Sequence, residues 1–247
     1  GSLSITDIMT YLYFKEMKVD VNQPKNPDRD RFVMSKGHCA PALYSTLAEK
    51  GFFPKEDLLT LRKTDSYLEG HPNMNTVPGV DMSTGSLAQG ISAAVGMALA
   101  GKLDKKEYRV FVGLGDGELE EGQVWEAAMA AAHYKLDNMI CFVDYNGLQI
   151  DGKITDVMNP EPIADKFKAF GWHVQSIDAH DYEQIHQAVE NAKQNKGTPN
   201  IIVCRSVKGK GVSFMENQPG WHGVAPKPEE RDRAIAELND YLASLGA

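Results

Sequence analysis

The chain carries the stretch Gly115-Asp116-Gly117-Glu118-Leu119-Glu120-Glu121-Gly122, which lies where a predicted strand passes into a predicted helix. The apolar run 110–114 leads into this stretch, and the helical pattern 124–132 follows it. A second apolar run, 139–143, leads to Asn146. If the two strands are parallel neighbours, Asp116 and Asn146 lie together at the carboxyl edge of the sheet, where open α/β sheets bind ligands.

A hard cation fits between these two residues. Mg²⁺ prefers oxygen ligands and is usually held by one or two protein groups together with substrate phosphates. Asp116 offers a charged oxygen, Asn146 a neutral one, and the backbone carbonyl of Leu148 a third. Gly115 and Gly117 let the backbone approach phosphates closely, and the helix after them presents free N–H groups to an anion. The stretch therefore predicts a site for a metal-bound diphosphate.

The pairing of Gly115-Asp116-Gly117 with Asn146 resembles the diphosphate-binding motif of thiamine diphosphate enzymes. Further segments, spread in order over nearly the whole chain, resemble transketolase. These segments are Ser35-Lys36-Gly37-His38, Glu69-Gly70-His71-Pro72, Thr84-Gly85-Ser86-Leu87-Ala88-Gln89-Gly90, Asp151-Gly152, Lys208-Gly209-Lys210-Gly211 and Trp221-His222-Gly223. A Gly-Asp-Gly alone is equally consistent with an ordinary turn. The ordered set favours the transketolase family and the diphosphate-binding domain of the thiamine diphosphate-binding fold.

Three histidines gain catalytic roles from this resemblance. It places His38 and His222 near the diphosphate and the reacting carbon of the cofactor, and it has His71 hydrogen-bond the hydroxyls of the donor sugar. Without such context a loop histidine is more often surface or structure than a catalyst. The other histidines fall at predicted helix or strand edges and are interpreted as structural: His133, His173, His180 and His186.

The resemblance also implies cofactor contacts outside the acidic turn. Gly85, Ser86 and Leu87 would meet the aminopyrimidine ring, although Ser86 also suits the cap of a helix. Glu121 matches a family glutamate in a carboxylate network between two active sites, but an acidic residue near a helix N-terminus is nearly as good an interpretation. Ile150 resembles the apolar contact beneath the thiazolium ring and is equally suited to a core.

The implied ligand sets can be stated by residue. Lys208 and Lys210 are expected to help close a loop over the diphosphate. The cofactor would contact His38, Gly85, Ser86, Leu87, Gly115, Asp116, Gly117, Glu121, Asn146, Ile150 and His222, and the metal, Mg²⁺ or Ca²⁺ in its place, would be bound by Asp116, Asn146 and Leu148.

Two nucleotide-binding motifs fail on inspection. The dinucleotide fingerprint G-x-G-x-x-G would start at Gly113 and would need glycine where Glu118 stands, next to phosphates that an acidic side chain repels. The segment 208–211 lacks both the upstream glycine and the Gly-Lys-Ser/Thr ending of a phosphate-binding loop.

Bulk composition limits the class of protein. The 247 residues are 42% hydrophobic, which is ordinary for a globular chain rather than a disordered one. The net charge of −8 disfavours a nucleic-acid surface, and no apolar run approaches the roughly 20 residues that span a bilayer. Cys39, Cys141 and Cys204 lack metal-ligand spacing, and no signal peptide opens the chain, which favours reduced cysteines and a cytoplasmic location.

Alternating helix and strand patterns predict an α/β fold with a mainly parallel sheet and helices on both faces. The predicted strands are 108–114, 139–144, 172–177 and 200–206. The predicted helices are 5–17, 40–50, 55–63, 86–103, 122–136, 162–170, 181–195 and 228–245. Residues 1–226 are assigned to the thiamine diphosphate domain and residues 227–247 to a linker and C-terminal helix.

Two departures from the family pattern concern what lies beside this segment. Transketolases usually carry a Gly-His-Pro-Gly segment just before the stretch that begins at Gly1, so its histidine is either trimmed or absent. A second α/β domain, which in the family binds the aminopyrimidine, is also missing. We therefore expect the N-terminal subunit of a split transketolase of carbohydrate metabolism (the pentose phosphate pathway), although a section of a longer chain stays possible.

The expected assembly is a heterotetramer with a C-terminal transketolase subunit, acting on sugar phosphates and not on nucleic acid or membranes. The Ala- and Gly-rich segments 86–101 and 124–132 would pack partly against other subunits. Two alternatives stay open. One is a subunit or fragment of another thiamine diphosphate enzyme, of the 2-oxo-acid dehydrogenase or deoxyxylulose phosphate synthase type. The other is a noncatalytic cofactor-binding scaffold.

Overall fold

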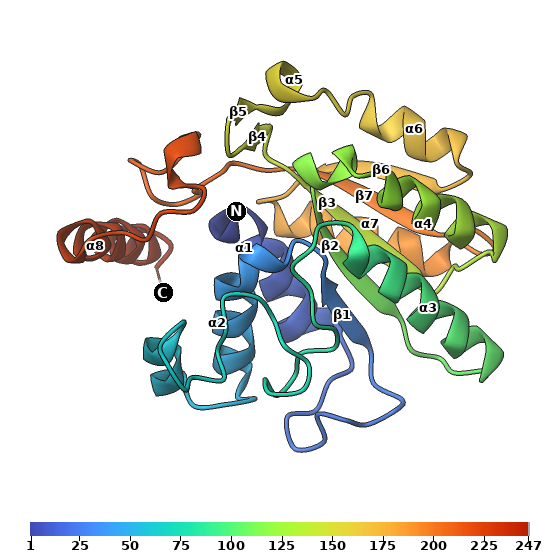
Figure 1. The fold of residues 1–247 in the computed structure, drawn as a ribbon, viewed down its shortest axis with the longest axis horizontal. Helices are drawn as coiled ribbons and strands as arrows, with labels where there is room; N and C mark the ends of the chain where they lie inside the picture. The colour runs from blue at the N-terminus through green and yellow to red at the C-terminus, as the bar shows by residue number, and fades with distance from the viewer. Residues whose placement is uncertain (247) are drawn as a thin grey trace.

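A computed structural model describes residues 1–246 and contains a five-stranded sheet in the order β1-β2-β3-β7-β6 (Figure 1). Every neighbouring pair of strands in this sheet is parallel. The strands are β1 (Arg31–Met34), β2 (Val110–Gly115), β3 (Met139–Tyr145), β6 (His173–Asp178) and β7 (Asn200–Arg205). The predicted α/β class with a mainly parallel sheet is confirmed.

Helices cover both faces of the sheet (Figure 1). One face packs against α1 (Ser2–Tyr11), α2 (Ala40–Lys50) and α7 (Tyr182–Gln194). The other face packs against α3 (Gln89–Leu103), α4 (Gly122–His133) and α6 (Ile163–Ala169). Short helical turns complete the chain: η1 (Leu12–Glu16), η2 (Gly37–Cys39), η3 (Lys55–Thr60), η4 (Gly117–Glu120), α5 (Ile154–Val157) and η5 (Pro219–Trp221).

The apolar runs of the strands follow from burial on both faces. Successive side chains of a strand point to opposite faces, and β3 divides accordingly. Ile140 and Phe142 join the core under α1, α2 and α7, whereas Met139, Cys141 and Val143 join the core under α3, α4 and α6. All five side chains are fully buried, so β3 is a continuous apolar run in the sequence.

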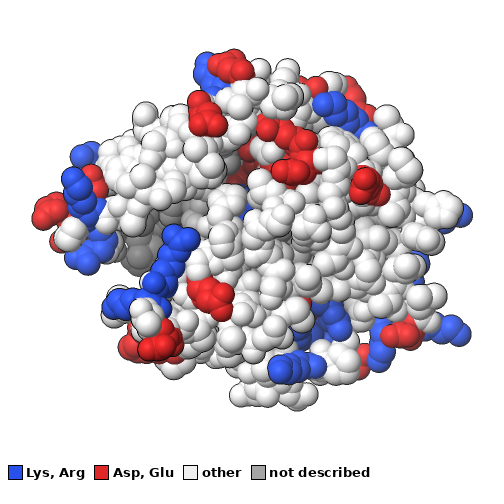
Figure 2. Space-filling model, viewed as in Figure 1, with Lys and Arg blue, Asp and Glu red and all other residues white. Residues whose placement is uncertain are grey.

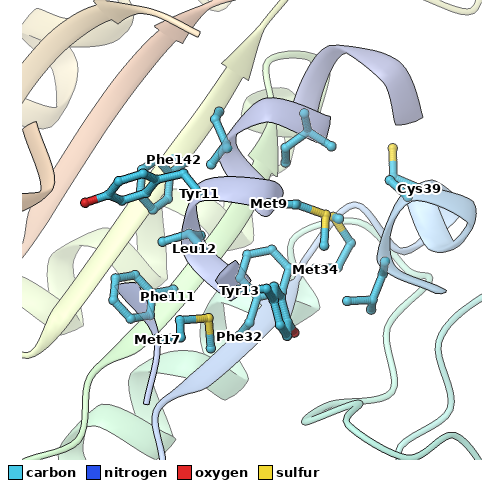
Figure 3. Packing of buried hydrophobic residues seen from close by; sticks show 14 of the residues in the cluster. Met9, Tyr11, Leu12, Tyr13, Met17, Phe32, Met34, Cys39, Phe111 and Phe142 are labelled. Carbon is cyan, nitrogen blue, oxygen red and sulfur yellow. The ribbon is translucent and has the colours of Figure 1, made fainter. Parts of the chain in front are cut away.

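Part of the hydrophobic core lies between α1 and β1 (Figure 3). Tyr13 and Phe32 form a T-shaped aromatic pair with ring centroids 5.8 Å apart. Met9 lies in the same cluster with Phe111 and Phe142 from β2 and β3. This packing holds α1 and β1 together on the sheet and thereby fixes where the chain leaves β1.

β1 lies outside the predicted strands. Its four residues are too few to show either an alternating or a continuous apolar pattern, and a polar loop precedes them. Arg31 pairs with Val110 and Met34 with Gly113 of β2, so pairing over a long sequence separation creates this strand. Because β1 and β2 are parallel, the segment after β1 starts at the same edge of the sheet as the acidic turn after β2.

Two predicted helices have different forms in the structure. The predicted helix 5–17 is an α-helix over Ser2–Tyr11 followed by a wider π-helical turn over Leu12–Glu16. The predicted helix 55–63 is a tighter 3-10 helix over Lys55–Thr60. The apolar pattern indicates which side chains are buried, but it does not distinguish an α-helix from tighter or wider turns.

The predicted helix 86–103 begins later than expected. α3 starts at Gln89, and its N-cap residue is Ala88, which has a left-handed backbone with φ of 68°. No side chain caps this helix, so the alternative interpretation of Ser86 as a helix cap is wrong. A non-glycine residue in this region is uncommon, so other contacts must hold it there.

Two peripheral segments complete the fold. An antiparallel hairpin, β4 (Leu148–Gln149) with β5 (Gly152–Lys153), follows β3 and leads into α5. α8 (Pro228–Ser244) lies away from the sheet, at the opposite side from α3 (Figure 1). The helix of the predicted C-terminal segment is present, although Ala247 lies outside the described residues and the domain division at residue 226 stays a prediction. Among residues 1–246, no helix is long and apolar enough to cross a membrane.

Candidate active site at the carboxyl edge of the sheet

The carboxylate of Asp116 joins the turns that follow β2 and β3. The register pairs Gly115 with Asp144, so the two strands end side by side. Asp116 Oδ1 accepts a hydrogen bond from Gly117 N at 2.9 Å, and Oδ2 accepts one from Gly147 N at 2.6 Å. The condition set from the sequence, that the strands be parallel neighbours, is therefore met.

Asn146, in the turn after β3, directly precedes Gly147, whose N–H donates to this carboxylate. Asn146 Oδ1 accepts a hydrogen bond from Leu148 N at 3.1 Å, and Leu148 pairs with Lys153 in the hairpin. Within residues 1–246 there is no cluster of three or more His, Cys, Asp or Glu side chains suited to a metal. A cation here would therefore depend on Asp116, an amide oxygen, a backbone carbonyl and ligand oxygens, which is a donor set that Mg²⁺ accepts.

Burial makes the charge of Asp116 unfavourable on its own. The residue is 3% exposed, and its burial, followed by repulsion from Asp144, raises the pKa of the carboxyl group to about 6. Backbone N–H groups and Lys36 act in the opposite direction without cancelling the effect. A divalent cation would relieve this by favouring the ionised form.

A buried ion pair lies near Asp116. Lys36, which follows β1, contacts the carboxylate of Asp144 at the end of β3. Ser4 Oγ donates a hydrogen bond to Asp144 at 2.6 Å, and Ser206 also donates to this carboxylate. Burial alone would lower the pKa of Lys36, but Asp144, together with Cys39 and Asp116, outweighs burial and raises it. Four segments of the chain therefore meet at one buried carboxylate.

Glu118 organises a second set of contacts that the sequence did not reveal. Its side chain is buried and accepts hydrogen bonds from Ser35 Oγ, from Ala88 N at 2.7 Å and from Gly115 N at 3.0 Å. These bonds tie together the ends of β1 and β2 and the start of α3. The bond to Ala88 explains how its left-handed backbone is held. From sequence, Glu118 counted only as a residue that breaks a nucleotide motif.

Two of the three predicted catalytic histidines stack on each other. The rings of His38 and His222 are 5.2 Å apart between centroids and inclined by 26°. Desolvation, followed by the positive charge of Lys36, lowers the pKa of His38 to about 4. Desolvation, followed by Lys208, lowers the pKa of His222 to about 3. Both rings are therefore neutral near pH 7.

Lys208 and His222 are in direct contact. Lys208 Nζ lies 3.0 Å from His222 Nδ1. An ammonium group has only donors, so His222 Nδ1 accepts and the ring proton resides on Nε2. Burial lowers the pKa of Lys208. The sequence placed both residues near the diphosphate but did not predict their contact.

The third histidine, His71, lies beside the segment expected to meet the aminopyrimidine. A Cβ added at Gly85 would lie 3.2 Å from the His71 ring, and one added at Gly37 would lie 2.7 Å from Gly85 N. Glycine at position 37 therefore lets the turn bearing His38 approach Gly85. In this way the structure brings the turns of all three predicted histidines to one edge of the sheet.

Three predicted contacts lie at the surface. Ile150 is 70% exposed at the tip of the hairpin, so its core interpretation is wrong. Glu121 is exposed at the N-cap of α4, and Ser86 is exposed before α3. Acidic side chains gather where η4 lies (Figure 2). The roles given to Ile150 and Glu121 involve a bound cofactor or a second active site, and they stay predictions.

The chain matches known proteins over most of its length. The family model of the transketolase thiamine diphosphate binding domain matches residues 1–239. The "6-deoxy-6-sulfo-D-fructose transketolase subunit SqwG" of Clostridium sp. (strain MSTE9) is 50% identical over 96% of this chain and 86% of its own length. An apulose-4-phosphate transketolase subunit of Phocaeicola vulgatus is 43% identical over 99% of this chain and 87% of its own length.

A comparison with solved structures agrees with these sequence matches. The crystal structure of transketolase from Campylobacter jejuni superposes with a TM-score of 0.88 at 34% identity. The match covers 96% of this chain and 38% of the Campylobacter chain, so this chain spans well under half of that solved structure. The family resemblance inferred from the motifs is confirmed. The chain belongs to the transketolase family, in which it corresponds to the thiamine diphosphate-binding portion.

Proposed function

We propose that this chain binds the diphosphate and metal of thiamine diphosphate and that, with a complementary subunit, it transfers a two-carbon ketol unit. The donor would be a ketose phosphate and the acceptor an aldose phosphate. One observation carries the proposal: Asp116 accepts from Gly117 N and Gly147 N and so joins the two motif turns, beside Asn146. The names of the relatives support the reaction class.

The metal would be held by Asp116, Asn146 and the carbonyl of Leu148. The raised pKa of Asp116 supports this assignment, because a buried carboxylate without a cation in contact gains most from one. Mg²⁺ is the first choice for such oxygen ligands with diphosphate, and Ca²⁺ is the alternative. Gly115 and Gly117 would let the backbone approach the diphosphate closely.

Bound thiamine diphosphate supplies the electron sink that makes ketol transfer feasible. The residues of this chain supply position and proton transfer. The neutral rings of His38 and His222 suit hydrogen bonding and proton exchange with an uncharged hydroxyl, since each ring nitrogen pair offers one donor and one acceptor. His71, beside Gly85, would hydrogen-bond donor hydroxyls. Gly85, Ser86 and Leu87 would meet the aminopyrimidine ring.

The proposed assembly is a heterotetramer of two copies of this chain and two of a C-terminal subunit. The names of the relatives, which describe them as subunits, support a complementary partner. On α4, Met129 is 64% exposed, and on α3 a Cβ at Gly96 would meet no other atom within 4 Å. These exposed apolar and small residues support the expectation that α3 and α4 pack against other subunits.

The donor sugar and the location complete the proposal. The two relatives are named for different sugars, so a role in the pentose phosphate pathway is one of several for this chain. Three buried free cysteines agree with a cytoplasmic location.

Mixing experiments test the proposed function. The purified chain alone should be inactive, and adding the complementary C-terminal subunit should restore ketol transfer from a ketose phosphate to an aldose phosphate. Transfer should require thiamine diphosphate and a divalent cation. Full activity of the chain alone would refute the division between two chains, and no activity in any mixture that binds cofactor would favour the noncatalytic scaffold.

A further inference from the structure

His180 lies in the turn between β6 and α7 and has no role in the proposed active site. Its Nδ1 is 2.6 Å from Asp7 Oδ2 in α1, and its Nε2 is 2.9 Å from Val207 N in the loop after β7. The His180 side chain is 12% exposed and that of Asp7 is 27% exposed. Tyr182 Oη also donates to the Asp7 carboxylate, at 3.2 Å. One imidazole thus links α1 to the loop that carries Lys208.

These two contacts fix the tautomer of the His180 ring. A backbone N–H can only donate, so His180 Nε2 must accept from Val207 and carries no proton. The ring proton then resides on Nδ1 and is donated to Asp7. A carboxylate that accepts from one ring nitrogen orients a histidine and sets which nitrogen is the acceptor. Asp7 therefore prepares His180 to receive the N–H of Val207.

The bond to Val207 acts on the next residue, Lys208. The Lys208 carbonyl accepts from Asn217 N at 2.9 Å, and Lys208 Nζ reaches His222 Nδ1 at 3.0 Å. His222 in turn stacks on His38. Each of these contacts depends on where the backbone at Val207 and Lys208 lies. A shift there would move the ammonium group away from the imidazole it orients.

We propose that His180, held by Asp7, is a positioning residue that sets the Val207–Lys208 backbone so that Lys208 orients the His222 ring. The role of His222 in the donor channel rests on the proposed function, but the positioning of its ring does not. A merely structural role would instead require the bond from His180 to Asp7, which connects α1 to the turn before α7. The two roles use different nitrogens of the same ring.

Two amide substitutions separate these roles. In His180→Gln the amide reaches about where Nε2 lies, so its oxygen can accept from Val207 N–H. In His180→Asn the amide is shorter and lies about where Nδ1 lies, so it can donate to Asp7 but leaves Val207 N–H without an acceptor. The positioning role predicts that His180→Gln keeps the His222 geometry and that His180→Asn loses it. The structural role predicts the opposite result: His180→Asn keeps the His222 geometry and His180→Gln loses it.

The test is ¹⁵N NMR of the His222 ring in the full chain without cofactor. In the wild type we expect the Nε2–H tautomer and a pKa of about 3. In His180→Asn, loss of the Lys208 contact should mix the tautomers and raise the pKa of His222 toward the ordinary value of about 6.5. His180→Gln should stay close to the wild type. His133→Asn, at an exposed position on α4, is the control and should change nothing.

An unchanged tautomer and pKa of His222 in folded His180→Asn would overturn the proposal, as would an equal change in both amide variants. If His180→Asn does not fold, Asp7→Ala provides the second test, because it removes the group that fixes the His180 tautomer. A smaller rise in the same direction is then expected, and no rise would contradict the proposal. These signals do not depend on turnover, so they remain interpretable if the ketol-transfer assay fails. In an active assembly, His180→Asn should lower kcat more than His180→Gln does.

Discussion

Two buried aspartates at opposite ends of the sheet differ in how their charge is balanced. Asp81, at the amino end, contacts the guanidinium of Arg29 and accepts from Phe32 N at 2.8 Å. Asp116, at the carboxyl end, accepts from two backbone N–H groups, and within residues 1–246 no Lys or Arg side chain forms an ion pair with it. Burial raises the pKa of both carboxyl groups.

We infer from this difference that Asp81 carries a structural charge and that Asp116 carries a functional one. Asp81 has its counter-ion inside the chain, so its loss leaves the largely buried guanidinium of Arg29 without a carboxylate, although Arg29 still donates to the Asp30 carbonyl. Asp116 has no Lys or Arg in contact, so we propose that its counter-ion comes with a ligand. We therefore expect substitutions of Asp81 to act on stability and substitutions of Asp116 to act on binding. The largest effect is expected at the proposed metal ligands.

Asp116→Ala and Asn146→Ala should each abolish metal-dependent binding of thiamine diphosphate in the complete assembly. They remove proposed cation ligands, so the loss should exceed the roughly 10- to 100-fold typical of an outer-shell partner. Calorimetric titration with and without Mg²⁺ measures it. Asp165→Ala, an exposed carboxylate on α6, is the control. Unchanged Mg²⁺-dependent affinity in both site variants would refute the ligand assignment.

His71→Ala tests a residue at the same edge that has no contact with the buried carboxylates. Cofactor binding should persist, while donor turnover should fall by about 10² to 10⁴, as is typical when a proton-transferring side chain is lost. Steady-state kinetics with a ketose phosphate donor checks this expectation. Wild-type turnover would return His71 to a structural role.

Asp81→Ala should lower the free energy of unfolding by about 3–5 kcal/mol, because it leaves a buried charge unpaired. Folded protein should still bind cofactor in the assembly. Chemical denaturation gives the stability change, with Asp28→Ala as the control. Asp28 forms an exposed pair with Lys106, and such pairs contribute about 0–1 kcal/mol. Equal effects of the two substitutions would remove the structural role of Asp81.

Glu118→Gln should have the smallest effect of the set. The amide keeps one acceptor oxygen but places a donor group against either Ala88 N–H or Gly115 N–H. A buried backbone donor without a partner costs about 1–3 kcal/mol, which denaturation of the chain should reveal. Glu120→Gln is the neighbouring control, because Glu120 is exposed, and it should stay within about 0.5 kcal/mol of the wild type. A Glu118→Gln chain as stable as this control would contradict the proposed contacts.

The sequence predicted the acidic turn because two signals agreed there. The apolar runs before Asp116 and Asn146 placed both residues at strand ends, and the motif supplied their chemistry. The contact between Lys36 and Asp144 could not be predicted from the sequence, for a different reason. Their contact requires β1, whose four residues carry no periodic signal, and the strand order that puts the ends of β1, β2 and β3 side by side.

The other contacts that the sequence did not predict have the same physical origin. Glu118 acts through backbone N–H groups of Ala88 and Gly115, and no pattern of residue types records which N–H groups lack a partner. His180 meets Asp7 only because α1 and the turn before α7 lie on the same face of the sheet. Local patterns thus pointed to the residues that we propose bind ligands, whereas the contacts of Glu118 and His180 emerged only from the tertiary structure.

The ionisation of Asp116 with pH links the difference between the two aspartates to metal binding. Its folded-state pKa of about 6 lies above the unfolded value of 3.8, so its contribution to stability is present below the unfolded pKa and is lost as the pH rises through about 6. A cation competes with the proton for the same carboxylate. Metal-bound cofactor should therefore stabilise the assembly more at pH values above about 6 than below it.

Carboxyl ¹³C NMR of Asp116 reports directly on where this carboxylate finds its counter-ion, with the signal assigned from the Asp116→Asn spectrum. In the metal-free chain we predict a midpoint near pH 6. With Mg²⁺ and thiamine diphosphate bound in the assembly, the carboxyl group should stay ionised to much lower pH. An ordinary midpoint near 3.8 in the metal-free chain, or a midpoint that Mg²⁺ and cofactor leave unchanged, would contradict the claim that Asp116 takes its counter-ion from the ligand.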